Sequence, residues 1–125
     1  MRALVAILAL LTIGPAIAQK GAPTNDKEEA VMLKSLETKC VAARKAYFKN
    51  SKDAKLKKAY VSATFNYAEA ILVTPILGPK DKYPKALGLY REVLKTDPKH
   101  TKAKAQANTI IKIYKDMGRP VPGGG

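Results

Sequence analysis

Cysteine and histidine each occur only once in the 125-residue sequence, as Cys40 and His100. A single cysteine cannot form an intramolecular disulfide, so we expect Cys40 to be a small buried apolar group, with an intermolecular bridge as the alternative. His100 follows Pro98 closely and is expected to be a solvated residue in the first turn of a helix. Nucleophilic catalysis needs a nucleophile within hydrogen-bond reach of a base. A buried Cys40 and a solvated His100 would not meet this requirement, so the sequence argues against a cysteine–histidine enzyme.

Acidic side chains are also few, with 10 Asp and Glu against 23 Lys and Arg. They are scattered along the chain, and no cluster has the spacing of a metal site. Gly78 and Gly88 are isolated, so no glycine-rich loop is present to hold a phosphate, and Gly88 is expected to mark a close contact between helices. The sequence therefore predicts no metal, no cofactor and no enzymatic activity.

The first eighteen residues have the pattern of a secretory signal peptide. A basic Arg2 precedes an apolar run over residues 3–13, and Ala16 and Ala18 form an A-x-A cleavage site. A membrane anchor is the alternative, but such a run spans only about 16 Å, roughly half of a bilayer core. Cleavage would remove one of 23 basic residues and leave 22 against 10 acids, a net charge of +12. We therefore expect a periplasmic or secreted protein, not an integral membrane protein.

The remaining chain lacks the alternation of strands and shows helical periodicity instead. Residues 19–25 read as a flexible leader, and residues 26–118 as one helical domain. Four helices are expected. The first two span about residues 26–47 and about residues 53–73. The third begins near residue 82, with Pro84 in its first turn, and the fourth is capped by Asp97 and ends before Gly118. A loop at residues 74–81 separates the second from the third, with Ile76 and Leu77 against the core. Residues 119–125 are expected to be a flexible tail. The fold class predicted is all-α, built of antiparallel helical hairpins.

Residues 60–98 resemble one degenerate tetratricopeptide (TPR) repeat. Its first helix would carry Tyr60 and Tyr67, and its second Tyr83, Ala86 and Tyr90, with Pro98 after the helix. The resemblance implies that Ala86 is the small residue at a close helix contact. It also implies a scaffold that binds proteins or peptides on a concave face, without catalytic residues. A plain helical bundle with the same buried stripe is the alternative.

Lysines gather around the junction of the first two expected helices, and we name six of them the basic rim: Lys45, Lys49, Lys52, Lys55, Lys57 and Lys58. Such a surface either keeps a small protein soluble or attracts an anionic partner. We expect an acidic protein or peptide as the partner, held by an adaptor in the bacterial envelope or outside the cell. The alternative is a structural protein that binds anionic envelope polymers or membrane surfaces. Nucleic acid is an improbable partner, because an exported protein rarely meets it.

The cleavage site yields a direct prediction about processing. Because signal peptidases cut after the second small residue of an A-x-A site, the exported protein should begin at Gln19 or at its cyclised form. Mass spectrometry of the intact exported protein measures this end. A secreted product that still begins at Met1 would contradict the interpretation.

Overall fold

The computed structural model of the chain describes residues 25–124. Within this range it contains four helices and no strand: α2 (Asp26–Lys49), α3 (Ala54–Val73), α4 (Pro79–Thr96) and α5 (Thr101–Asp116). The expected all-α fold is therefore confirmed. The predicted signal peptide and residues 19–24 of the predicted leader lie outside the described residues. None of the helices in residues 25–124 is both long and apolar enough to cross a bilayer.

Three of the four helices begin at a side-chain cap. Asn25 accepts from the backbone N–H of Glu28 at the start of α2, and Asp53 accepts from the N–H groups of Lys55 and Leu56 at the start of α3. Such caps satisfy amides that have no partner within the helix. The bounds of these two helices agree with the predicted ones.

The starts of α4 and α5 differ from the prediction. α4 begins at Pro79, because a proline in the first position of a helix removes no hydrogen bond. Pro84 therefore lies inside the helix and not in its first turn. Asp97 does not cap α5: it ends α4, and its side chain accepts from the N–H of Lys99 in the connecting turn. The cap of α5 is His100, whose Nδ1 accepts from the N–H of Ala103.

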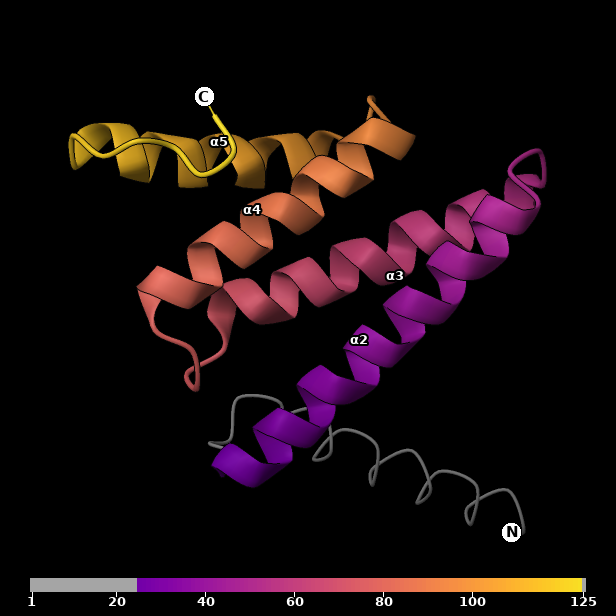
Figure 1. Cartoon of the computed structure of the whole chain (residues 1–125), viewed down its shortest axis with the longest axis horizontal. Helices are drawn as coiled ribbons and strands as arrows, with labels where there is room; N and C mark the ends of the chain where they lie inside the picture. Colours follow the sequence, from indigo (N-terminus) through magenta and orange to yellow (C-terminus); the bar gives the residue numbers. More distant parts are fainter. Residues whose placement is uncertain (1–24, 125) are drawn as a thin grey trace, which may run out of the picture.

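Each helix packs mainly on its neighbours in the chain, so α3 lies between α2 and α4, and α4 lies between α3 and α5. Figure 1 shows the chain reversing direction at each of three short connections, which gives a row of antiparallel hairpins. Repeat proteins of the solenoid type have this nearest-neighbour arrangement. A groove can therefore form where α2 and α4 diverge on either side of α3.

The core contains most of the residues that the repeat pattern singled out. Tyr60, Tyr67, Ala86 and Tyr90 are all buried, with Ala86 and Tyr90 fully inaccessible. Tyr83 is only half-buried but packs against the core. The remaining predicted packing residue, Pro98, is exposed in the turn before α5. Ile76 and Leu77 pack against the core from the α3–α4 loop, as expected.

Two expectations about the second half of the chain need correction. Gly88 is exposed, and a β-carbon there would have no neighbour within 4 Å, so it marks no helix contact. The tail folds back on the helices instead of extending freely: Arg91 donates to the carbonyls of Pro122 and Gly124, and Val121 packs against the core. The guanidinium of Arg91 and the side chain of Val121 thus hold residues 121–124 against α4.

These contacts predict opposite effects for two substitutions on α4. Ala86→Leu should destabilise the fold by about 1–3 kcal/mol, because a fully buried site has no room for a larger side chain. Gly88→Ala, the matched control two residues away, should stabilise it by about 0.5–1 kcal/mol, because alanine favours the helix and meets open space. Urea unfolding followed by circular dichroism measures both. An Ala86→Leu protein as stable as the parent would contradict this packing.

Candidate functional site

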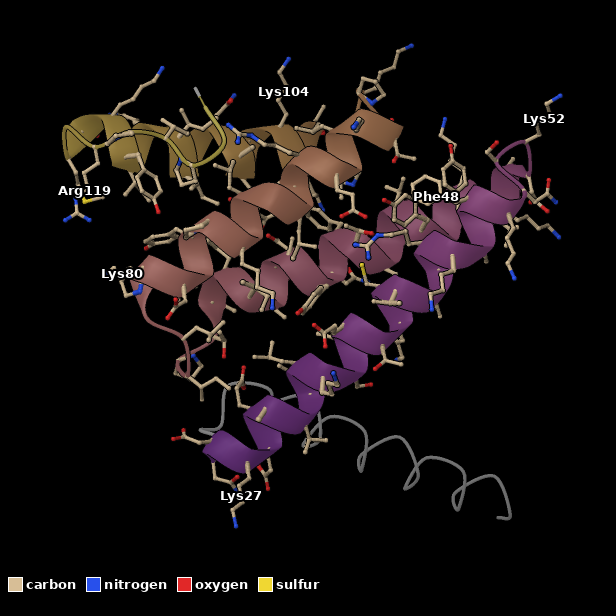
Figure 2. The ribbon with its side chains drawn as sticks, in the orientation of Figure 1. Lys27, Phe48, Lys52, Lys80, Lys104 and Arg119 are labelled. Carbon is tan, nitrogen blue, oxygen red and sulfur yellow. The ribbon has the colours of Figure 1, made fainter. Side chains whose placement is uncertain are left out.

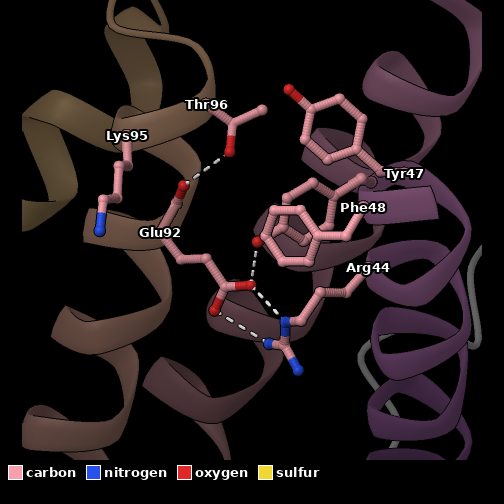
Figure 3. Close-up of a pocket in the computed structure, with 7 residues that line it drawn as sticks. Arg44, Tyr47, Phe48, Glu92, Lys95 and Thr96 are labelled. Atoms are coloured by element: carbon pink, nitrogen blue, oxygen red, sulfur yellow. Dashed lines mark hydrogen bonds and ion pairs between the residues drawn. The ribbon is translucent and has the colours of Figure 1, made fainter. Parts of the chain in front are cut away.

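A surface cleft of about 450 Å³ lies between α2 and α4, over the first half of α3. We call it the aromatic cleft, and Figure 3 shows its lining from α2 facing its lining from α4. Its lining comes from three helices and consists of Arg44, Tyr47, Phe48, Tyr60, Glu92, Lys95 and Thr96. The volume falls in the range of ligand-binding clefts in proteins.

Three aromatic rings form one wall and the floor of this cleft. Tyr47 stacks on Tyr60, with ring centroids 5.3 Å apart, and Phe48 packs against both rings at 5.5 and 5.7 Å. Tyr60 is buried, whereas Phe48 is 65% exposed. Phe48 therefore presents exposed apolar surface above the packed rings.

The polar side of the cleft is an ion pair between helices that are not adjacent in the row. Arg44 of α2 donates from Nε and Nη2 to the two carboxylate oxygens of Glu92 of α4, at 2.6 and 2.9 Å. Tyr60 of α3 donates its hydroxyl hydrogen to the same carboxylate. Three helices therefore meet at one carboxylate. Bidentate pairs of this kind fix both partners in position.

The pKa values of these groups follow from the same contacts. The hydrogen bond to Glu92 raises the pKa of Arg44, so the arginine stays charged. Burial, and then the hydrogen bond to Glu92, raises the pKa of the Tyr60 hydroxyl to about 12. Because Arg44 neutralises Glu92, the cleft presents no net negative charge to a ligand. The ammonium group of Lys95 adds a positive charge at its edge.

The basic rim surrounds the same end of the molecule. All six of its lysines are exposed, at the end of α2, in the connecting turn and at the start of α3. Figure 2 shows Lys52 on this turn and Phe48 close to it on α2. Lys57 and Lys58 also line a smaller cleft of about 260 Å³ with Asp97. The structure thus brings most of the predicted rim to one end, next to the aromatic cleft, although Lys45 lines a different hollow on the outer face of α2.

Sequence reasoning did not assign Phe48, Glu92 or Thr96 to a site. Glu92 carried a usable signal, because it is the only acid between Asp81 and Asp97 and precedes the buried Val93. An isolated acid beside an apolar stripe indicates a carboxylate with a specific partner. Its partner Arg44 lies 48 positions away, so only the packing of α2 near α4 identifies it.

The lone cysteine and histidine have structural roles. Cys40 is buried, as predicted, with its Sγ 3.4 Å from the hydroxyl oxygen of Thr64. His100 is not the solvated residue that was expected: besides capping α5, its ring lies 4.7 Å from that of Phe65. In residues 25–124 no three His, Cys, Asp or Glu side chains are close enough to hold a metal ion.

The raised pKa of Tyr60 predicts a loss of stability in alkali. Folding favours the protonated hydroxyl, so its contribution is complete below about pH 10 and is lost as the pH rises toward about 12. Tyr60→Phe should therefore be less stable than the parent at pH 8, and this difference should shrink by pH 12. Urea unfolding at a series of pH values measures the difference. A difference that does not change with pH would contradict the bond to Glu92.

Comparisons with protein-family models, with curated proteins and with solved structures give no significant match for this chain. The chemistry of its own surface is therefore the basis for inferring what it binds.

Proposed function

We propose that this protein is an exported helical adaptor that binds an acidic segment of another protein in the aromatic cleft. The observation that carries the proposal is the position of an exposed aromatic wall beside a basic rim, in a cleft whose carboxylate is neutralised. Such a site offers an apolar contact and electrostatic attraction to the same ligand. The signal-peptide pattern of residues 1–18 supports a periplasmic or secreted location.

The chemistry of the cleft favours a peptide with both apolar and acidic residues. One apolar side chain of the partner would pack on Phe48 and Tyr47, where burial of aromatic surface contributes most of the affinity. Neighbouring carboxylates would lie near Lys52 and Lys95, which steer the approach of the partner more than they hold it. Arg44 is already paired, so it serves to shape the cleft.

The arrangement of hairpins also supports the TPR-like interpretation. Helices that pack mainly on their chain neighbours leave a concave surface along one side of the row, and repeat proteins bind partners on such surfaces. The aromatic cleft opens between two helices that flank a third, α3. We therefore include a TPR-like scaffold in the proposal.

A second candidate function rests on the distribution of charge. Six of the acids are buried or half-buried, namely Glu29, Glu37, Asp53, Glu69, Glu92 and Asp97, and the other four lie at or near helix ends, so lysines dominate the outer faces. A surface of this kind can bind anionic envelope polymers without any specific groove. The two candidates differ in how affinity depends on salt and on the position of the charge.

The test is a selection from a random 12-residue peptide library on immobilised protein of residues 19–125. Fluorescence polarisation then measures the affinity of an enriched acidic peptide at low and high salt. Phe48→Ala should weaken binding about tenfold or more at both salt concentrations, because it removes a buried apolar contact. Reversal of four rim lysines, Lys52, Lys55, Lys57 and Lys58, to Glu should weaken binding strongly at low salt and less at high salt.

The matched control reverses four exposed lysines elsewhere: Lys99, Lys102, Lys104 and Lys115, all to Glu. It changes the net charge equally and should reduce affinity far less than the rim variant. Equal losses in the two quadruple variants, with Phe48→Ala unchanged, would support binding of polyanions through charge alone. A selection that enriches no peptide would also count against the adaptor.

A further inference from the structure

A second cleft, of about 730 Å³, lies between the first turns of α4 and the end of α5. We call it the α4–α5 cleft. It lies at the opposite end of α4 from Glu92 and Lys95, so it is separate from the aromatic cleft. Figure 2 shows Lys80 and Arg119 on one edge of the molecule, with Phe48 and Lys52 toward the other. Its lining is Pro79, Lys80, Tyr83, Ile113, Tyr114, Met117 and Arg119.

The floor of the α4–α5 cleft is apolar. Tyr83 and Tyr114 pack against the core and are half-buried, and the half-buried Ile113 lines the cleft beside them. Met117 is 54% exposed at the edge. Five of the seven lining side chains therefore present carbon surface, and no carboxylate is among them.

Two cations stand at the rim of this floor without a counter-ion. In residues 25–124 the ion pairs involve Lys34, Arg44 and Lys112, and neither Lys80 nor Arg119 takes part in one. Tyr83 and Tyr114 likewise have no hydrogen-bond partner for their hydroxyl groups among the described residues. The cleft thus joins carbon surface to unpaired positive charge and free hydroxyl groups.

The backbone at the end of α5 sets the position of Arg119. Gly118 has a φ of +66°, a conformation that favours glycine. The N–H of Gly118 donates to the carbonyl of Lys115, and the N–H of Arg119 donates to that of Tyr114, which is the Schellman pattern of a helix end. This turn changes the direction of the chain after α5, so that Arg119 lines the cleft instead of continuing along the helix axis.

We propose that the α4–α5 cleft binds a fatty acid, with its carboxylate near Lys80 and Arg119 and its alkyl chain along Tyr83, Ile113 and Tyr114. The positive rim complements the carboxylate, and the volume falls in the range of small-molecule sites. An alkyl chain needs no hydrogen bonds, whereas a peptide backbone laid on this floor would find few partners besides the hydroxyls of Tyr83 and Tyr114. The chemistry of the floor therefore favours a fatty acid over an acidic peptide.

The test measures binding of hexanoate, octanoate and decanoate to protein of residues 19–125 by calorimetry, below their micelle concentrations. Affinity should rise with chain length by up to about fourfold for each CH₂ group that enters the cleft. Decanol should bind at least tenfold more weakly than decanoate, because it lacks the charge. Amide shifts in NMR spectra should change around residues 79–83 and 113–119 and not around Phe48.

Variants distinguish this site from general attraction to a basic protein. Lys80→Gln with Arg119→Gln should weaken decanoate binding at least tenfold, whereas the control Lys102→Gln with Lys104→Gln, which removes as much charge from the exposed start of α5, should change it less than twofold. Gly118→Ala keeps every charge but strains the turn that positions Arg119, and should also weaken binding. Circular dichroism confirms that each variant is folded.

Three results would overturn the proposal. The first is equal loss of affinity in the two double variants, which would show attraction to net charge only. The second is affinity that does not depend on chain length. The third is full competition between decanoate and a peptide whose binding depends on Phe48, which would show that decanoate binds in the aromatic cleft.

Discussion

Hydrogen bonds from tyrosine hydroxyls to glutamates join the helices of this protein. Tyr60 of α3 donates to Glu92 of α4, and Tyr90 of α4 donates to Glu69 of α3, which also accepts from Gln106 of α5 at 2.8 Å. The hydroxyl oxygen of Tyr67 in α3 lies 3.4 Å from a carboxylate oxygen of Glu37 in α2. Each tyrosine buries its ring in the core and directs its hydroxyl to a carboxylate on a neighbouring helix. Buried polar groups of this kind require such partners, so the bonds specify how the helices align.

The same bonds determine how charge is distributed. Glu37 of α2, Glu69 of α3 and Glu92 of α4 accept from tyrosines of neighbouring helices, while every lysine of residues 25–124 except Lys82 is exposed. Asp53 and Asp97 accept backbone N–H groups at the ends of helices. The outer faces therefore carry most of the positive charge, even though the chain contains ten acids. This arrangement gives both proposed sites a positive rim.

The two clefts lie at opposite ends of α4 and differ in their polar groups. In the aromatic cleft, Arg44 is paired with Glu92, and the other cations are exposed lysines around the exposed ring of Phe48. In the α4–α5 cleft, no carboxylate is among the lining residues, Lys80 and Arg119 take part in no ion pair within residues 25–124, and the helix end sets the backbone position of Arg119. A ligand's negative charge would meet dispersed lysines at the first site and Lys80 together with Arg119 at the second.

Much of the helical body follows from local sequence signals. Apolar spacing predicts all four helices, and the capping residues Asn25 and Asp53 mark the starts of α2 and α3, because a cap acts within one turn of chain. The burial of Cys40, Tyr60, Ala86 and Tyr90 follows from their places on the stripes. Prolines misled the prediction, since both Pro79 and Pro98 can begin a helix and only Pro79 does.

The sequence by itself determined the helical periodicity, the excess of lysine, the pattern of the N-terminal segment and the buried faces, because these properties depend on composition and on neighbours three or four residues apart. Only the tertiary structure decided which residues meet across helices. Arg44 and Glu92 are 48 positions apart, and the tail reaches Arg91 across 31 positions. Such contacts depend on the angles at which α2, α4 and α5 cross, and these angles arise from packing of the whole core.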